Sequence, residues 1–179
     1  MVKRLVLCLL LIPLPLFGAR EKGKPVQPRM SEWEVTVTKV HDGDTITCQV
    51  SRTVFHVRLA EIDAPELKQT SGPEAKAALE KLILGKQVWL RWNSTMNDRY
   101  GRSIGNVYAT LPSEDERGRP KWGEWINLRM VKDGWAWRYP EYSKTPSIAD
   151  AEKEARGAKL GLWKDADPTP PWVFRNKGK

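Results

Sequence analysis

The sequence predicts a mainly β protein, in which a closed five-stranded barrel of the OB-fold type carries about three flanking helices. Five short segments have the composition of strands, and a segment typical of a helix follows the third of them. Clusters of Gly, Pro, Asp and Ser separate these segments, as turns require. An OB-fold barrel with added helices accounts for this number of strands. The 179 residues, 40% of them hydrophobic, suffice for one domain with a real core.

The strands are recognised by the alternation of apolar and polar residues. Trp33, Val35 and Val37 fall on one face of an extended chain, and the polar residues between them fall on the other. The Asp-Gly pair within residues 41–44 predicts a turn after this strand. We expect strands over residues 33–38, 45–50, 53–62, 87–92 and 104–110.

Three further segments have the pattern of helices. Ser71 and Glu74 have the spacing of a capping box, and Gly85 can end the helix that they begin. Ser147 and Asp150 are expected in the capping positions of another helix. The expected helices run from Ser71 to Gly85, from Glu124 to Asp133 and from Ser147 to Gly161.

The N-terminus has the layout of a secretory signal peptide. A short basic segment with Lys3 and Arg4 precedes an apolar run over residues 5–17, and small residues follow. The run is shorter than the ~20 residues of a membrane-spanning helix, so an uncleaved anchor is the less favoured alternative. We therefore expect a secreted or periplasmic protein. The expected organisation is a signal peptide over residues 1–19, a flexible leader over 20–30, the barrel domain over 31–166 and a proline-rich, basic tail over 167–179, frayed at its end.

The chain is basic, with a net charge of +8 and an isoelectric point of about 9.6. This charge favours polyanionic partners such as nucleic acid, an anionic membrane or acidic glycans, although a solvated basic surface is the plain alternative. Removal of residues 1–19 would lower the net charge to +6 and leave Cys48 as the one cysteine. Because Cys48 lies in an expected strand, we predict a buried thiol and a domain held together by packing alone.

Acids and arginines near the ends of the expected strands can supply the parts of a phosphodiester hydrolysis site. Attack of water on a phosphodiester adds negative charge in the transition state, so the reaction needs a base and fixed cations. Asp44 and Asp63 offer hard oxygen ligands for a weakly bound Ca²⁺, which polarises a phosphoryl oxygen. The guanidinium groups of Arg58 and Arg102 suit phosphate oxygens. Glu66 can accept the proton of the attacking water.

Each of these motifs also has an ordinary structural interpretation. The acids of residues 42–44 flank a glycine and, taken alone, are more often simple turn residues. Arg58 could form an ion pair with Glu61. Residues 63–66 could be an acidic strand end, and residues 98–102 a solvated hairpin. The catalytic interpretation therefore depends on the co-occurrence and order of the motifs.

The order of three motifs resembles the thermonuclease family, the relatives of staphylococcal nuclease. Asp-Gly-Asp-Thr occupies residues 42–45, Arg-x-x-x-Ile-Asp-Ala-Pro-Glu occupies 58–66, and Tyr-Gly-Arg occupies 100–102. The resemblance extends from about Trp33 to Trp163, and the block 58–66 is its most specific part. Members of this family are OB-fold barrels with flanking helices, and they act as Ca²⁺-dependent endonucleases on DNA and RNA that leave 3′-phosphate ends.

Carried over residue by residue, the resemblance implies a calcium site. Asp44 and Asp63 would bind Ca²⁺ through their side chains, and Ala64 would bind it through its backbone carbonyl. Asp42 matches the other acid of the first motif and would support the site without touching the metal.

The resemblance also implies a catalytic trio. Arg58 matches the phosphate clamp, Glu66 the general base, and Arg102 the residue that stabilises the transition state or acts as the acid. The substrate would be DNA or RNA, bound by a monomer without a stable protein partner.

Four residues match positions that contact a bound nucleotide in the family. Arg99 and Tyr100 lie where the family contacts a terminal phosphate. Tyr139 and Tyr142 match, by a looser alignment, its paired tyrosines at the base and phosphate pocket. The alternatives for a base-stacking face are Trp135 and Trp137.

Three features depart from the family pattern. Glu61 stands where many members have glycine, so it is either a bystander or an acid that weakens the approach of phosphate. The segment 67–72 is shorter than the family's loop after the base, which leaves open whether the substrate preference is that of the family. The polar, proline-bearing segment Leu111–Lys121 is longer than expected and is predicted to be a surface loop.

Three other functions remain as alternatives. A two-histidine hydrolase would need His41 and His56 in one cleft, and nothing in the sequence requires them to meet. A non-catalytic OB-fold module for single-stranded nucleic acid would explain the charge and the aromatic residues, but it needs no acids beside two arginines. A basic structural protein of a membrane or wall would explain charge and export, but not the acidic motifs.

Overall fold

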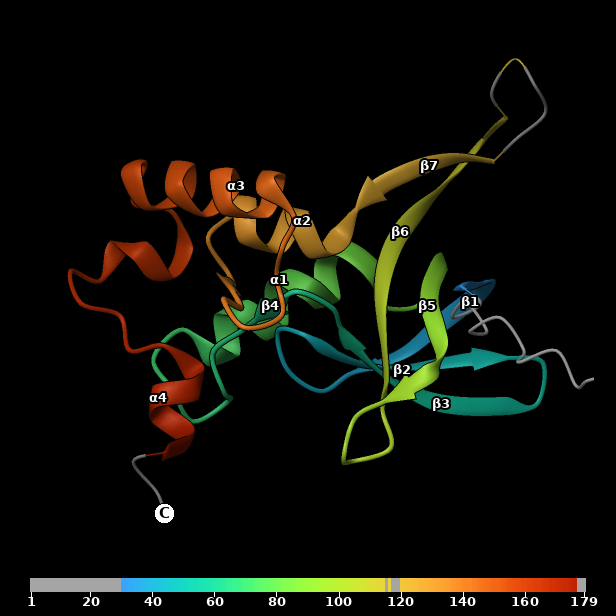
Figure 1. Ribbon diagram of the computed structural model, residues 1–179, viewed down its shortest axis with the longest axis horizontal. Coiled ribbons are helices and arrows are strands. Elements are labelled where there is room, and N and C mark those ends of the chain that lie inside the picture. The colour runs from blue at the N-terminus through green and yellow to red at the C-terminus, as the bar shows by residue number, and fades with distance from the viewer. Residues whose placement is uncertain (1–29, 115, 117–119, 177–179) are drawn as a thin grey trace, which may run out of the picture.

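Five strands form the closed barrel that the sequence predicts (Figure 1). The computed structural model describes residues 30–114, 116 and 120–176. Strands β1, β2 and β3 form an antiparallel meander, β5 lies beside β1, and β6 lies beside β5. A parallel pairing of β3 with β6, which joins residues 57–59 to residues 103–105, closes the barrel. The bounds are Met30–Val40 for β1, Thr45–Val50 for β2, Thr53–Leu59 for β3, Gln87–Asn97 for β5 and Ser103–Glu114 for β6.

The third predicted strand, over residues 53–62, is in fact two strands. β3 ends at Leu59, and the short strand β4, Ile62–Asp63, pairs instead with β8, Trp137–Arg138. Between them Glu61 has a φ of +66°, a left-handed conformation that ends an extended strand. This turn carries the second acidic motif out of the barrel sheet and towards the C-terminal half of the chain.

Helices cover one side and one end of the barrel (Figure 1). The three predicted helices are present, and a further short helix forms in the segment that is predicted to be a tail. No helix of the described residues has the length and apolar character needed to cross a membrane. The predicted signal peptide and all of the leader before Met30 lie outside the described residues. The helices are α1, Gly72–Ile83; α2, Ile126–Lys132; α3, Pro146–Gly157; the 3-10 helix η1, Gly161–Lys164; and α4, Pro171–Asn176.

The helices lie close to their expected positions and Ser71 is the N-cap residue of α1 as predicted, but the predicted side-chain capping bonds do not form. Ser71 precedes α1 with a φ of +67° and makes no side-chain capping hydrogen bond. α3 begins at Pro146 after Thr145, so Ser147 and Asp150 lie inside the helix rather than at its cap. Both helices carry a proline in their first turn, which removes one of the N–H groups that a cap would satisfy.

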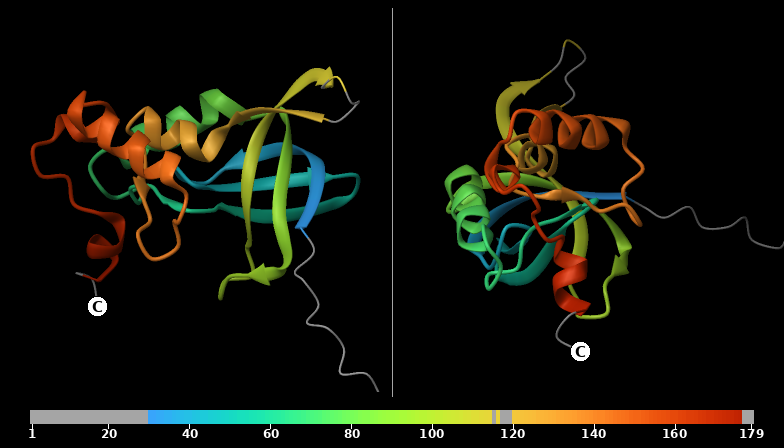
Figure 2. Two further views of the ribbon diagram at one scale, coloured as in Figure 1. Left: turned by 45° about the horizontal axis from the view of Figure 1, so that its top comes forward. Right: turned by 90° about the vertical axis from the view of Figure 1, so that its left-hand side faces the viewer.

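The segment Leu111–Lys121 is not a plain surface loop. β6 continues to Glu114, and β7, Pro120–Trp125, returns beside it as an antiparallel strand (Figure 2). Gly123 permits this pairing, because a Cβ atom there would clash with the carbonyl oxygen of Ala109. Since β7 runs to Trp125, α2 begins at residue 126 and not at 124 as predicted. Residues 115 and 117–119 lie outside the described residues.

The hydrophobic core fills the barrel and extends to the helices. Val37, Ile46 and Leu90 are fully buried on three different strands, and Leu79 of α1 and Met130 of α2 belong to the same cluster. The apolar face of each strand that the alternation pattern identifies is therefore the interior of the barrel.

Cys48 is confirmed as a buried core residue with a free thiol. Burial raises the pKa of the Cys48 thiol to about 12. A thiol that stays protonated at neutral pH is a poor nucleophile, so Cys48 acts as a small hydrophobic side chain.

Asn127 of α2 is fully buried and ties the helix to the barrel beneath the site. Its Oδ1 accepts a hydrogen bond from the N–H of Val107 at 2.9 Å, and its Nδ2 donates to the carbonyl of Ala60 at 3.0 Å and of Gly105 at 3.2 Å. Asn127 thereby holds the turn between β3 and β4, from which the acidic motif departs.

We expect Asn127→Ala to lower the free energy of unfolding by about 3 kcal/mol, because it leaves buried backbone groups without partners. Urea unfolding followed by circular dichroism measures the loss. Asn176→Ala, at an exposed position of α4, is the control with the same substitution. A loss of less than about 1 kcal/mol would show that these bonds do not hold the turn.

Candidate active site

The turn between β1 and β2 fixes the position of Asp44. Oδ1 of Asp42 accepts a hydrogen bond from the backbone N–H of Asp44 at 3.0 Å, so the first acid of the motif orients the second. Gly43 lies against Ala64 and against Ala75 of α1, and a Cβ atom at Gly43 would come within 2.6 Å of the Cβ of Ala64. The glycine therefore allows the turn to pack directly against the second acidic motif.

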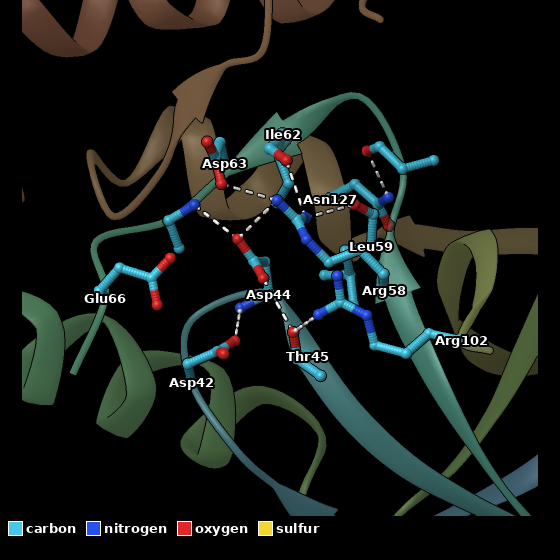
Figure 3. A network of polar contacts seen from close by, with 12 residues as sticks. Asp42, Asp44, Thr45, Arg58, Leu59, Ile62, Asp63, Glu66, Arg102 and Asn127 are labelled. Carbon is cyan, nitrogen blue, oxygen red and sulfur yellow. Dashed lines mark hydrogen bonds and ion pairs between the residues drawn. The ribbon is translucent and has the colours of Figure 1, made fainter. Parts of the chain in front are cut away.

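Arg58 lies at the centre of the site (Figure 3). Its Nη1 donates to the carbonyls of Leu59 and Ile62, both at 2.8 Å. Its Nη2 lies 2.7 Å from Oδ1 of Asp63 and 3.0 Å from Oδ2 of Asp44. One nitrogen atom thus joins the acids of two motifs, which confirms that the motifs meet in space. Arg58 does not pair with Glu61, the ordinary alternative for this arginine.

Two buried carboxylates lie side by side around this guanidinium group. Asp44 is 5% exposed and Asp63 is 1% exposed. Burial raises the pKa of Asp44 well above its usual range, while the charge of Arg58 opposes that rise. Two buried carboxylates require cationic partners, and their hard oxygen atoms suit a cation such as Ca²⁺.

The side chains alone do not make a complete metal cage. In the described part of the chain, no group of three or more His, Cys, Asp and Glu side chains is arranged to hold a metal ion. A cation on Asp44 and Asp63 would therefore need main-chain or water oxygens as further ligands. Ala64 lies at the right place, because its N–H donates to Oδ2 of Asp44 at 2.6 Å. Its carbonyl as a ligand remains a prediction.

Glu66 borders the site on the side opposite Arg102 (Figure 3). Its backbone N–H donates to Oε1 of Gln69 at 2.9 Å, and Nε2 of Gln69 donates to the carbonyl of Thr169 at 2.9 Å. Gln69 is buried, so it fixes the Glu66 loop and joins it to the C-terminal segment. Oε1 of Glu66 accepts a hydrogen bond from Arg175 at 2.8 Å.

Arg175 is a residue of the site that the sequence analysis misses. The sequence predicts a frayed basic end here, but residues 171–176 form α4, and Arg175 contacts both Asp63 and Glu66. The one local signal for this helix is Pro171, since proline favours the first position of a helix. The pairing itself joins residues 112 positions apart, and no local pattern reports such a contact.

Arg102 reaches the site from the loop between β5 and β6. Its Nε donates to Oδ2 of Asp98 at 2.7 Å, and its Nη1 donates to Oγ1 of Thr45 at 3.1 Å. Burial would raise the pKa of Asp98, but hydrogen bonds from Arg102 and Tyr100 outweigh it, so the pKa is lowered. Oγ1 of Thr45 in turn donates to Oδ1 of Asp44 at 3.1 Å, which links Arg102 to the buried acids.

Glu61 does not lie among the acids of the site. Its carboxylate accepts hydrogen bonds from the hydroxyls of Ser143 and Thr145 at 3.2 and 3.0 Å. Its carbonyl accepts one from the N–H of Tyr139 at 2.9 Å. Glycine adopts the positive φ of this position with the least strain, which explains the glycine of other family members. Here the carboxylate fastens the 139–145 segment to the turn.

The four predicted substrate-binding residues form two groups, in which Arg99, Tyr100 and Tyr142 are exposed and Tyr139 is half-buried. The guanidinium groups of Arg99 and Arg102 lie 4.9 and 5.4 Å from the centre of the Tyr100 ring, which is 69% exposed. Tyr139 and Tyr142 make an edge contact at 4.8 Å. The charge of Glu141 and a hydrogen bond with it raise the pKa of Tyr142, whereas the nearby charge of Arg99 lowers it. Arg99 and Tyr142 are therefore near enough to interact electrostatically.

Trp137 is not a free stacking face, which corrects one of the alternatives. It is 3% exposed and packs against Trp163 and Trp172. Trp135 is only half-buried, but it packs against the main core. Trp172 of α4 instead lies stacked on Tyr139, at 5.7 Å and an interplanar angle of 6°.

His41 and His56 do meet, contrary to the expectation from the sequence. Nε2 of His41 and Nδ1 of His56 lie 2.7 and 3.1 Å from Oγ1 of Thr47, and the two rings make an edge contact at 5.3 Å. Burial, with the charges of Lys39 and His56, lowers the pKa of His41. In the described part of the chain neither histidine makes a hydrogen bond or ring contact with the buried acids, so the pair lies outside the acid and arginine cluster.

The barrel and the cluster of acids and guanidinium groups define a hydrolase of the endonuclease class, and the comparisons agree. Residues 56–165, more than half of the chain, match the family described as Staphylococcal nuclease homologue. The protein therefore belongs to this family, as its motifs predict.

Three relatives illustrate the similarity. An uncharacterized endonuclease of Escherichia coli O157:H7 is 41% identical over 141 residues, which cover 79% of this chain and 84% of the relative. A micrococcal nuclease of Shigella flexneri is 38% identical over 85% of this chain and 86% of its own. A probable staphylococcal-like nuclease of Oryza sativa subsp. japonica is 37% identical over 68% of this chain and 29% of its own. The relatives are named as nucleases and imply a nucleic-acid substrate.

Proposed function

We propose that the protein is an exported, Ca²⁺-dependent endonuclease that hydrolyses phosphodiester bonds in DNA and RNA and leaves 3′-phosphate ends. The observation that carries the proposal is the meeting of Asp44, Asp63 and Arg58 at a single nitrogen atom. Glu66 and Arg102 border this centre (Figure 3). A structural ion pair needs one acid for one arginine, whereas hydrolysis of a phosphodiester needs this larger set.

In this proposal Asp44 and Asp63 hold the calcium ion with the carbonyl of Ala64, and Asp42 orients Asp44. When bound, the ion polarises a phosphoryl oxygen and neutralises part of the charge that develops. The support is the burial of both acids side by side, which places hard oxygen donors next to each other in a poorly hydrated site. Extracellular calcium modules function with dissociation constants of about 10⁻⁴–10⁻³ M, so a sparse set of ligands suffices for an exported enzyme.

The catalytic residues are Arg58, Glu66 and Arg102. Glu66 is partly exposed and accepts the proton of the attacking water. Arg58 and Arg102 stabilise the negative charge of the five-coordinate phosphorus, and Arg102 is also placed to assist the leaving 5′ oxygen. Two carbonyls fix Arg58, and Asp98 with Thr45 fixes Arg102, so both cations are oriented before the substrate arrives.

Substrate binding is assigned to Arg99, Tyr100, Tyr139 and Tyr142. Exposed rings of Tyr100 and Tyr142 can stack on bases, and the net charge of +8 favours a polyanion. We propose further that the protein acts as a monomer and that residues 1–19 direct its export to the periplasm or the medium.

Product analysis tests the proposal. The full chain is incubated with Ca²⁺ and 5′-labelled, single-stranded DNA or RNA of mixed sequence. We expect internal cleavage of both substrates into fragments that a polymerase extends only after phosphatase treatment. Fragments that are extended without phosphatase would carry 3′-hydroxyl ends and contradict the proposed product. Retention of the intact strands on the protein would favour the alternative of a non-catalytic binding module.

A further inference from the structure

Arg175 reaches the candidate site from α4, which lies outside the residues that match the family. It donates to Oδ1 and Oδ2 of Asp63 at 3.2 and 2.8 Å, and to Oε1 of Glu66 at 2.8 Å. One side chain thus engages both oxygens of a proposed metal ligand and one oxygen of the proposed base. Figure 1 shows α4 beside the loop that precedes α1, on which Glu66 lies.

A calcium ion and this guanidinium group cannot share Asp63 without cost. Calcium lies at about 2.3–2.6 Å from its oxygen ligands, so it would stand next to a cation that already occupies the same oxygens. Asp63 is 1% exposed, and the solvent therefore screens this repulsion poorly. Calcium and Arg175 must compete for the carboxylate.

Arg175, rather than Arg58, is the cation that can leave. Arg58 is 13% exposed, lies on a barrel strand, and donates to two backbone carbonyls in addition to the acids. Arg175 is 39% exposed, lies on a helix of six residues, and its side chain donates hydrogen bonds to Asp63 and Glu66 but, among the described residues, to no backbone carbonyl. Loss of those carboxylates as partners leaves Arg175 free to turn into solvent.

We propose that Arg175 is a positioning residue that occupies Asp63 and Glu66 as an internal counter-cation until calcium displaces it. This inference rests on the proposed calcium-dependent function and adds a control of calcium affinity to it. Without calcium, Arg175 keeps a buried acid and the base paired and oriented. When calcium binds, Glu66 is released from Arg175 and becomes free to accept a proton from water.

The same helix covers the proposed nucleotide-binding surface. Trp172 of α4 is stacked on Tyr139, and it also contacts Trp137 at 6.5 Å. Movement of α4 would uncover the face of Tyr139 at the same time as it frees Asp63. If α4 moves together with Arg175, calcium and nucleotide favour the same state, and each should strengthen the binding of the other.

Calorimetric titration of Ca²⁺ into the full chain, prepared without metal, tests the competition. We expect Arg175→Gln to tighten the calcium dissociation constant by roughly tenfold, the scale of one charge-assisted hydrogen bond between competing states. Arg175→Lys keeps the positive charge but loses the planar guanidinium group that binds two acids at once. Its calcium dissociation constant should therefore lie between those of the wild type and Arg175→Gln. Lys132→Gln removes one positive charge at an exposed position of α2 and should behave like the wild type. Asp63→Asn should abolish the calcium heat.

Amide hydrogen exchange measures directly whether α4 is displaced. Addition of Ca²⁺ should accelerate exchange of the α4 amides of the wild type, and in particular that of Phe174, whose N–H donates to Pro170 at 3.0 Å. Thermal unfolding in chelator should show that Arg175→Gln lowers the melting temperature, and that Ca²⁺ then raises it by more than in the wild type. A purely structural ion pair would lower the melting temperature equally with and without Ca²⁺.

The outcomes separate the two proposals. If the wild type binds Ca²⁺ but Arg175→Gln binds it no more tightly, and α4 exchange is unchanged, then Arg175 is not displaced and the inference is wrong. If neither the wild type nor any Arg175 variant binds Ca²⁺ at millimolar concentrations, the calcium-dependent function itself fails. Circular dichroism of each variant confirms that it is folded before titration.

Discussion

Arg58→Ala is expected to lower kcat by about 100- to 1000-fold, the usual effect of removing one fixed cation or donor from a site where negative charge develops. It should also lower the free energy of unfolding by about 3–5 kcal/mol, because Asp44 and Asp63 lose the partner that they share inside the protein. Both effects follow from the single position of this side chain between two buried acids. Cleavage rates with denatured DNA and urea unfolding measure them separately.

Two variants make the Arg58 experiment specific. Arg58→Lys keeps the charge but cannot donate to Leu59, Ile62 and both acids at once, so it should recover more stability than activity. Arg52→Ala removes an exposed arginine from the turn of the same hairpin and should leave rate and stability near the wild type. A normal rate for a folded Arg58→Ala protein would show that Arg58 is a structural ion pair only.

Glu66→Gln should lower kcat by about 100- to 10,000-fold, the range for loss of a general base, with a much smaller change in KM. The amide has the shape of the carboxylate and can still accept a hydrogen bond from Arg175, so stability should change by less than about 1 kcal/mol. Glu66→Gln should therefore lower the rate without lowering stability, whereas Arg58→Ala should lower both. Steady-state kinetics at saturating Ca²⁺ give both constants.

Glu74→Gln is the matched control, since it makes the same substitution in the first turn of α1. Its kcat should equal that of the wild type. If Glu66→Gln instead keeps its kcat and raises KM alone, Glu66 contributes to binding and another group must activate the water.

The barrel is predictable from the sequence because the alternation of residues such as Trp33, Val35 and Val37 is a local property of each strand. The third strand is predicted too long because no Gly, Pro, Asn or Asp marks a turn between Leu59 and Ile62, although the backbone turns at Glu61 with a positive φ. β7 escapes prediction because its segment carries Pro120 and charged residues, and it is formed by pairing with β6. The local pattern of residues predicts that a strand forms, whereas the residue at which the strand ends depends on the strand that pairs with it.

The central cluster is predictable in part, for a similar reason. Asp63 and Glu66 follow Arg58 by a few residues, so one turn brings them together once β3 ends. Asp44 faces Arg58 because Thr45 pairs with Arg58 in the β2–β3 register. The contact of Arg175 cannot be predicted in this way, since it needs the packing of the whole C-terminal segment.

The most direct test of the account is cleavage of denatured DNA by the wild type and by Asp63→Asn, each with Ca²⁺ and with excess EDTA. Asp63→Asn is nearly isosteric and removes one proposed ligand charge. The account predicts that EDTA abolishes cleavage by the wild type, that added Ca²⁺ restores it, and that folded Asp63→Asn stays inactive at the same Ca²⁺ concentration. Full wild-type activity in EDTA, or normal activity of Asp63→Asn, would contradict it.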